Sequence, residues 1–179
     1  RTLTYHEATP GHHHQIAHSL ENEDLTLYRR FGYGTSAFAE GWALYAERLA
    51  LEVGLAEDPY DELGILQSEI FRAVRLVVDT GMHYKRWTRE EAMKYMKEKT
   101  GMSDTEVRVE IERYIVWPGQ ALSYKVGMIK ILELRERAMQ ELGNKFNIKD
   151  FHSAVLDHGN PPLFIVEEMV NKMVEDAKN

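Results

Sequence analysis

Four histidines and a glutamate lie within the first fourteen residues of the chain, and these residue types bind transition metals. His6 and Glu7 are followed by the pair Pro10-Gly11 and then by a run of histidines that begins at His12. Imidazole nitrogen and carboxylate oxygen are ligands that zinc prefers, and a catalytic zinc site has three protein ligands and one open position. In the helical pattern His-Glu-x-x-His, both imidazoles share one face and the glutamate acts as general base. The segment therefore predicts a metal site with Glu7 beside it.

The spacing departs from that pattern, because the second histidine follows the first after six residues rather than four. On a regular helix, His12 would point about 120° away from His6. Proline disfavours helix in the residue before it, and glycine tolerates unusual backbone angles. We therefore expect Thr9-Pro10-Gly11 to bulge and to bring His12 beside His6. His13 is the alternative ligand, since it faces the correct side without a bulge, although about 10 Å further along the helix axis.

A third ligand is expected from another helix, and Glu40 is the best candidate. It lies in an apolar stretch, Phe38-Ala39-Glu40-Gly41-Trp42-Ala43-Leu44. A carboxylate in apolar surroundings is costly unless it is paired or bound to a metal, and Gly41 permits another group to approach closely. The alternative is an exposed glutamate on a helix surface. Glu47, two turns further on, is expected either to support a metal ligand or to be solvated.

A metal site with a glutamate beside the first histidine, as in His-Glu-x-x-His, is typical of enzymes that hydrolyse peptide bonds. Such hydrolysis also requires a hydrogen-bond donor to the oxyanion of the tetrahedral intermediate. Tyr124 is the first candidate, because it follows Pro118-Gly119-Gln120, where a helix restarts, and a phenol can donate without competing for the metal. His83 is the second candidate, since a histidine near the end of a helix is favoured in its charged form. Asp79 is a candidate to orient His83 or a ligand imidazole. Both oxyanion candidates could equally be structural, one as a core tyrosine and one as a helix cap.

Three further residues are candidates for contacts with the substrate. Arg113 or Lys125 could hold a substrate carboxylate, and arginine could do so through two parallel hydrogen bonds. Gln120 could donate to, or accept from, a peptide group. The alternative for both cations is an ion pair within the fold.

The elements that position these residues are all expected to be helices. Apolar residues recur at helical spacing, as in the stripe Ile65, Ile70, Val74, Val77 and Val78. Capping-box patterns begin at Thr88 and Ser103, and glycines 54, 101, 143 and 159 fall where helices are expected to stop. The pattern predicts a single all-α domain over residues 1–179, with helices at Pro10–Asn22, Thr35–Val53, Pro59–Lys85, Arg89–Thr100, Asp104–Val116, Pro118–Leu142, Lys149–Asp157 and Pro162–Ala177.

Composition narrows the range of partners. The formal charge of -7 argues against nucleic acid, and no apolar run is long enough to span a membrane. The chain has no cysteine, which excludes a thiolate zinc site and a cysteine nucleophile. The expected partner is a peptide or small amide substrate. Because the chain begins with Arg1 rather than Met, we expect a fragment of a longer protein, so the compartment, cytoplasmic or exported, stays open. The sequence does not indicate the oligomeric state.

Four motifs occur in an order that resembles a bacterial family known as domain of unknown function 885. They are His6-Glu7-x-x-Pro10-Gly11-His12-His13-x-Gln15, then Glu40-Gly41-Trp42-Ala43-x-Tyr45-x-Glu47, then Asp79-Thr80-Gly81-Met82-His83 with Trp87-Thr88-Arg89-Glu90-Glu91-Ala92, and Tyr114-x-x-x-Pro118-Gly119-Gln120-Ala121-x-x-Tyr124-Lys125. The similarity covers nearly the whole chain, which resembles the C-terminal part of longer family members.

The resemblance implies a zincin-like metallopeptidase catalytic domain of the class whose third zinc ligand is a glutamate. His6, His12 and Glu40 would then hold zinc, and Glu7 would be the general base that activates a zinc-bound water. The expected function is therefore zinc-dependent hydrolysis of peptide or related amide bonds. The alternatives are a metal-binding module without catalysis, a helical interaction module without metal, and a ferrous iron site, because two histidines and a carboxylate also bind iron.

Overall fold

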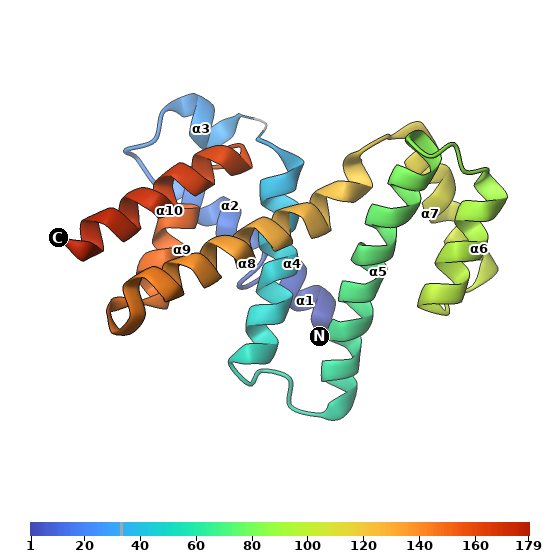
Figure 1. Cartoon of the computed structure of the whole chain (residues 1–179), viewed down its shortest axis with the longest axis horizontal. Helices are drawn as coiled ribbons and strands as arrows, with labels where there is room; N and C mark the ends of the chain where they lie inside the picture. The colour runs from blue at the N-terminus through green and yellow to red at the C-terminus, as the bar shows by residue number, and fades with distance from the viewer. Residues whose placement is uncertain (33) are drawn as a thin grey trace.

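The computed structural model describes residues 1–32 and 34–179, and all regular secondary structure in this part of the chain is helical (Figure 1). The elements are α1 (Thr2–Glu7), α2 (His12–Glu21), α3 (Leu27–Phe31), α4 (Ser36–Glu52), α5 (Pro59–His83), α6 (Arg89–Thr100), α7 (Asp104–Val116), η1 (Gln120–Leu122), α8 (Ser123–Leu142), η2 (Gly143–Lys145), α9 (Ile148–Leu156) and α10 (Leu163–Lys178). The expected all-α class is confirmed.

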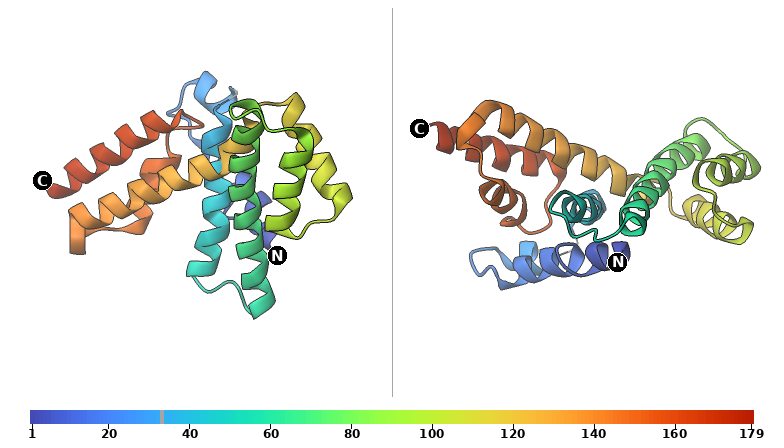
Figure 2. Two further views of the ribbon diagram at one scale, coloured as in Figure 1. Left: turned by 45° about the vertical axis from the view of Figure 1, so that its right-hand side comes forward. Right: turned by 90° about the horizontal axis from the view of Figure 1, so that it is seen from below.

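Helices α4 and α8 cross at the centre of the molecule. A side chain at Gly127 would place its Cβ 1.9 Å from the carbonyl oxygen of Ala37, and one at Gly41 would lie 2.4 Å from the Cα of Gly127. The two backbones can approach this closely only because both positions are glycine. Helices α1 and α2 form a layer along another side of α4, as the right-hand view of Figure 2 shows. The crossing therefore fixes α4 as the support for the N-terminal segment.

The buried apolar residues divide into two clusters. The first lies among α4, α8, α9 and α10 and includes Trp42, Tyr45 and Phe151. The second lies among α5, α6 and α7 and includes Val78 and Ile111. Helix α5 thus joins the α6–α7 pair to the central helices, and α1 contacts both α4 and α5 (Figure 1).

Helix ends agree best with prediction where capping residues mark them. Helices α6 and α7 have the predicted bounds, and Thr88 and Ser103 each form a complete capping box. Gly101 ends α6 with a left-handed backbone, and glycines 54, 143 and 159 also have positive φ at helix ends.

Several expectations need correction. Helices α1 and α3 were not predicted, and the single predicted helix Pro118–Leu142 begins as a 3₁₀ turn before α8. In the proposed apolar stripe of α5, Ile70 and Val77 are exposed (46% and 37%), because the core contacts only the face that carries Ile65, Val74 and Val78.

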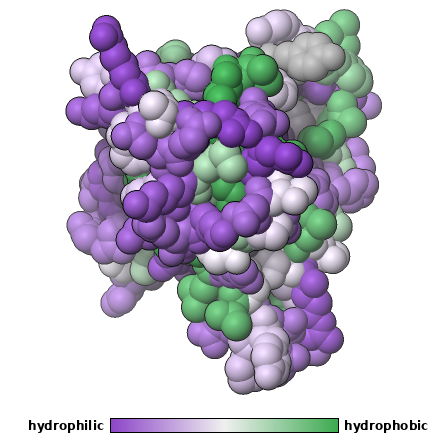
Figure 3. Space-filling model, turned by 90° about the vertical axis from the view of Figure 1, so that its right-hand side faces the viewer, coloured by the Kyte–Doolittle hydropathy of each residue, from purple (hydrophilic) through white to green (hydrophobic). Residues whose placement is uncertain are grey.

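The side of the molecule formed by α6 and α7 is mainly hydrophilic, with apolar atoms visible in a central area framed by polar residues (Figure 3). None of the helices in the described ranges combines the length and apolarity needed to cross a bilayer.

Candidate metal centre

His6, His12 and Glu40 converge where α1 ends, α2 begins and α4 passes. Each offers a ligand atom, and these atoms lie within 4.8 Å of one another. The Nε2 atoms of His6 and His12 lie 3.7 and 3.2 Å from Oε2 of Glu40. Ligands placed tetrahedrally at about 2 Å from one zinc ion are about 3.4 Å apart, so the spacing fits such an ion. His13 is exposed and does not belong to the group.

The break between α1 and α2 brings the two histidines together. Helix α1 ends at Glu7, and α2 begins at His12, so the expected bulge is a complete interruption of the helix. A Cβ at Gly11 would lie 1.8 Å from the carbonyl oxygen of His6, which leaves no space for a side chain. The indole Nε1 of Trp42 donates to the carbonyl oxygen of Pro10 at 2.9 Å and holds this turn against α4. The Pro-Gly pair therefore permits the ligand spacing of six residues.

Glu47 fixes the orientation of the His6 ring. Its Oε1 lies 2.6 Å from Nδ1 of His6, and both side chains are buried, with 1% and 3% exposed. When Nδ1 donates its proton to Glu47, the lone pair of Nε2 points toward Glu40. Burial lowers the pKa of His6, but the hydrogen bonds with Glu40 and Glu47 outweigh it and raise the pKa overall. Carboxylate support of this kind is common behind metal-binding histidines.

Glu40 is ionised at neutral pH despite its partial burial. Burial raises the pKa of Glu40, but hydrogen bonds from His12 and His6 act in the opposite direction and lower it to about 2. A hydrogen bond from Tyr124 contributes to the same shift. The carboxylate is therefore in the form that can bind a cation.

Tyr124 lies beside the three converging residues. Its ring stacks on that of His6 with 6.3 Å between the centroids, and its side chain is 7% exposed. The side-chain amide of Gln120 lies 3.4 Å from its hydroxyl oxygen. The guanidinium groups of Arg72 and Arg75 lie 5.8 and 4.7 Å from its ring centroid. A phenol hydroxyl near Glu40 and two cations can donate a hydrogen bond to an anion formed at the site.

Glu7, His83 and Asp79, which were also predicted to act in catalysis, are not among the three converging residues. Glu7 is the last residue of α1 and is exposed. His83 ends α5, and its Nε2 lies 2.9 Å from the carbonyl oxygen of Tyr114. Asp79 accepts the backbone N–H of Gly119, at 3.1 Å to one oxygen, and so holds the turn before η1. Asp79 therefore supports a backbone turn rather than an imidazole.

The residues predicted to contact substrate are paired with one another or with the fold. Nη2 of Arg113 donates to Oε1 of Gln120 at 3.1 Å, next to Tyr124. Lys125 forms an ion pair with Glu69 at 2.6 Å, with only 15% of the lysine side chain exposed.

Sequence reasoning did not identify Arg72, which contacts both Glu47 and Tyr124, the two side chains next to His6. Its Nη2 is 3.9 Å from Oε1 of Glu47, and its guanidinium faces the ring of Tyr124. The available signal was the presence of two arginines, Arg72 and Arg75, inside the apolar run of α5. A cation in such a run has to find a buried partner.

Comparison with known proteins gives a family and two similar structures. The profile of the bacterial proteins of unknown function DUF885 matches residues 1–170. A crystal structure of a "putative lipoprotein" from Colwellia psychrerythraea is 54% identical, with a TM-score of 0.94, and the match covers 98% of this chain and 30% of that one. A "putative lipoprotein of unknown function" from Shewanella oneidensis is 30% identical, with a TM-score of 0.87, over 95% of this chain and 31% of that one.

No curated protein matches the chain. The chain spans about a third of the length of the two solved proteins. The profile match, the fold and the order of the four motifs agree with one another. This chain belongs to the bacterial family of unknown function DUF885.

Proposed function

We propose that this chain is the metal-binding catalytic part of a zinc-dependent hydrolase that acts on peptide or related amide bonds. The observation that carries the proposal is the convergence of His6, His12 and Glu40, whose ligand atoms lie within 4.8 Å of one another. Two imidazoles and one carboxylate are a donor set found at catalytic zinc. The hydrogen bond from His6 to Glu47 and the ionised state of Glu40 further support this assignment.

The side chains around these ligands have the types that amide hydrolysis needs. Zinc, when bound, would supply a Lewis acid that polarises the carbonyl and makes water more acidic. Glu7 would accept the proton of the attacking water and pass it to the leaving amine. Tyr124 would donate a hydrogen bond to the carbonyl oxygen as negative charge develops on it. Glu47 would hold the ring of His6 in the tautomer that leaves Nε2 free.

A metal-binding module without catalysis is the rival interpretation. The observation in its favour is that Glu7 is exposed and has no side-chain hydrogen bond among the described residues. The solved relatives are also about three times longer, so that the walls of a substrate cleft could come from parts that this chain does not include. Both interpretations require the same three ligands.

Substitution of Glu7 by Gln separates the two interpretations. Catalysis requires the carboxylate, whereas metal binding does not, so E7Q should retain zinc and lose peptide cleavage by at least about 100-fold. Glu40→Gln should lose both, because it removes a ligand. Zinc content would be measured by atomic spectroscopy and cleavage by mass spectrometry of a peptide library. Equal cleavage by E7Q and the unsubstituted chain would refute the assignment of Glu7, and absence of stoichiometric zinc would refute the proposal.

A further inference from the structure

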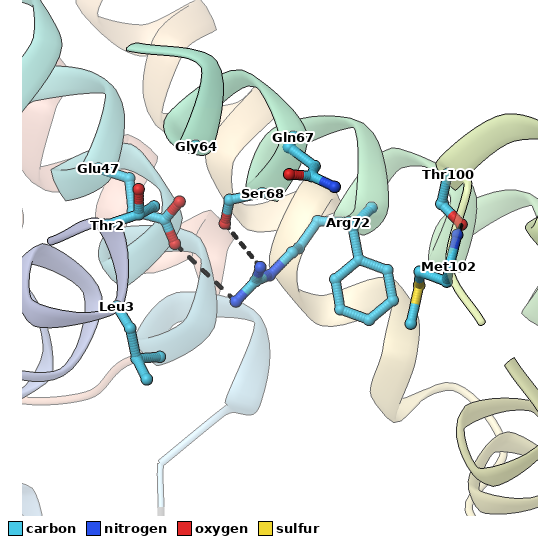
Figure 4. A pocket seen from close by; sticks show the side chains of 10 residues that line it. Thr2, Leu3, Glu47, Gly64, Gln67, Ser68, Arg72, Thr100 and Met102 are labelled. Carbon is cyan, nitrogen blue, oxygen red and sulfur yellow. Dashed lines mark hydrogen bonds and ion pairs between the residues drawn. The ribbon is translucent and has the colours of Figure 1, made fainter. Parts of the chain in front are cut away.

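A pocket of about 290 Å³ lies next to the metal centre, between α1, α5 and the end of α6. Figure 4 shows the side chain of Arg72 near the middle of the lining, joined to Glu47 and Ser68, with Leu3 and Met102 on opposite sides of it. Glu47 belongs both to this pocket and to the metal centre, because its Oε1 accepts a hydrogen bond from His6. The volume lies just below the range typical of drug-sized ligands, so the pocket has space for about one amino-acid residue.

Arg72 brings a positive charge into the pocket with few partners. Its side chain is 14% exposed, and its Nη1 donates to Oγ of Ser68 at 2.6 Å. Its Nε is buried without a hydrogen-bond partner among the described residues, and its Nη2 is 3.9 Å from Glu47, beyond hydrogen-bond distance. A guanidinium has five donor hydrogens. The charge of Arg72 is therefore paired with Glu47, but its buried Nε has no hydrogen-bond partner among the described residues, which is costly unless a ligand supplies an acceptor.

The rest of the pocket is largely apolar. Leu3, Phe71 and Met102 contribute to its walls, and the guanidinium of Arg72 lies 5.3 Å from the ring centroid of Phe71. A cation at one side and apolar side chains at the others match a ligand that has a carboxylate and an aliphatic or aromatic side chain. Oε1 of Glu47 accepts a hydrogen bond from His6 and faces Arg72, whereas Oε2 is buried without a hydrogen-bond partner among the described residues, so a ligand carboxylate would have to bind on the side of Arg72 that faces away from Glu47.

Arg72 also lies close to Tyr124, the proposed oxyanion donor. Its guanidinium is 5.8 Å from the ring centroid of Tyr124, and that ring is stacked on His6. The two cations predicted from the sequence to hold a carboxylate are less suitable. Arg113 donates to Gln120, and Lys125 is paired with Glu69.

We propose that this pocket binds the C-terminal residue of the substrate, with its free carboxylate on Arg72 and its side chain against Leu3, Phe71 and Met102. This inference rests on the proposed hydrolase function and makes the enzyme a carboxypeptidase or dipeptidase. Water would add across the last peptide bond, so that the C–N bond breaks, the acyl carbon gains a hydroxyl group and the nitrogen gains a proton. The products are a shortened peptide acid and a free amino acid with an apolar side chain.

The test compares N-acetyl-leucine with N-acetyl-leucinamide, which differ in the carboxylate alone. Each would be titrated into the zinc-free chain and followed by amide chemical shifts in NMR, so that the readout does not depend on catalysis or on metal. We expect the acid to bind at least about tenfold more tightly than the amide, because hydrogen bonds between arginine and carboxylate are charge-assisted. Arg72→Gln should reduce this ratio to less than about twofold. Arg89→Gln, which removes an arginine paired with Glu112 outside the pocket, should leave the ratio unchanged.

Equal binding of the two probes to the unsubstituted chain, or binding of neither, would overturn the proposal without any variant being required. A tenfold preference that persists in R72Q would overturn the role of Arg72. If R72Q does not fold, Arg72→Lys replaces it and should lower the ratio, because an ammonium lacks the planar fork of donors. A chain that prefers the acid but cleaves no peptide would refute the hydrolase and retain the pocket. A chain that cleaves amidated and free peptides equally well would retain the hydrolase and refute the carboxylate site.

Discussion

The buried carboxylate of Glu47 orients the His6 ring, which is one of the proposed metal ligands. An ionised group that is 1% exposed needs partners to offset its desolvation, and Glu47 has a hydrogen bond from His6 at 2.6 Å and the positive charge of Arg72 at 3.9 Å. In return, the negative charge makes Nε2 of His6 a better electron donor. We therefore expect the partners of Glu47 to affect metal binding at the proposed site, although Glu47 is not one of the proposed ligands.

Glu47→Gln should weaken zinc binding by about 10- to 100-fold, the usual effect of removing a partner behind a ligand histidine. The amide keeps the size of the side chain but removes the charge that polarises His6. Competition with a chromogenic zinc chelator would measure the affinity. Glu52→Gln, on the same helix but paired with Arg135, is the matched control and should bind zinc normally. Equal affinities in the two variants would contradict the role given to Glu47.

Adjacent histidines offer a sharp test of the ligand assignment. His12 has its Nε2 3.2 Å from Glu40, whereas His13 is exposed and outside the group. His12→Ala should therefore reduce zinc affinity by at least about 100-fold, and His13→Ala should change it by less than about threefold. Equilibrium dialysis with zinc analysis would measure both. The reverse result, with His13 required, would show that α2 is turned differently in the metal-bound protein.

The sequence predicts the ligands better than the residues that support them. His6, His12 and Glu40 were identified because ligand types stand out in their surroundings, and the structure brings them together. The buried state of Glu47 depends on how α1 packs on α4, which spacing along the chain does not reveal. Arg72 is similar, since its closeness to Glu47 depends on how α5 lies beside α4.

At the scale of the elements, the α4–α8 crossing depends on the absence of side chains. Gly127→Ala should destabilise the fold by about 2 kcal/mol or more, because its Cβ would lie 1.9 Å from the carbonyl oxygen of Ala37 and the backbones would have to separate. Gly64→Ala is the control, since its Cβ would meet only the side-chain oxygen of Thr2, at 3.0 Å. The control should stay within about 1 kcal/mol of the unsubstituted chain. Urea unfolding would compare the two, and equal effects would contradict the close crossing.

The packing of α9 on α4 should depend on pH through His152. Burial, followed by the charges of Arg135 and His14, lowers the pKa of His152 to about 4, and its Nε2 accepts the hydroxyl of Tyr45 at 2.8 Å. The unfolded chain binds this proton at a pKa of about 6.5. Between pH 6.5 and 4 the unfolded state holds more protons, so this stabilisation is complete above pH 6.5 and is lost as the pH falls.

Unfolding free energies measured from pH 7 to pH 4.5 would test this contribution. The slope due to His152 should reach up to about 1.4 kcal/mol per pH unit and should disappear from the total in His152→Gln. The carboxylates titrate in the same way in the unsubstituted chain and in His152→Gln, so the difference between the two curves is due to His152. Parallel curves for the two proteins would show that His152 is protonated without cost.

Helix prediction succeeded where local signals are strong and failed where tertiary contacts decide. Helices α6 and α7 carry capping boxes, and their predicted bounds are confirmed. Helices α1 and α3 have only six and five residues, too few to show an apolar period. Ile70 and Val77 fit a helical stripe but are exposed, because periodicity does not tell how wide a face the neighbouring helices cover.

For the whole molecule, the proposed metal centre lies at the N-terminal segment rather than inside either apolar cluster. Helix α1 is too short to be stable by itself. Three interactions hold it in place. His6 is hydrogen-bonded to Glu47, the hydroxyl of Tyr5 donates to the carbonyl oxygen of Leu55, and Arg1 forms an ion pair with Glu57. A zinc ion at the proposed site would add direct bonds that join α1 and α2 to α4.

Removal of zinc should therefore loosen one region and leave another unchanged. Zinc at 100 times its dissociation constant would stabilise the folded state by about 2.7 kcal/mol. Because the ligands lie on α1, α2 and α4, a chelator should increase hydrogen exchange of amides in residues 2–21 and around Glu40. The cluster of α5, α6 and α7 contains no proposed ligand, so the exchange of its core amides, near Val78 and Ile111, should not change. Hydrogen exchange followed by mass spectrometry, with and without chelator, measures both regions. Equally faster exchange in the two regions would contradict this prediction, because it would mean that the two clusters unfold together and that the ion stabilises the whole chain.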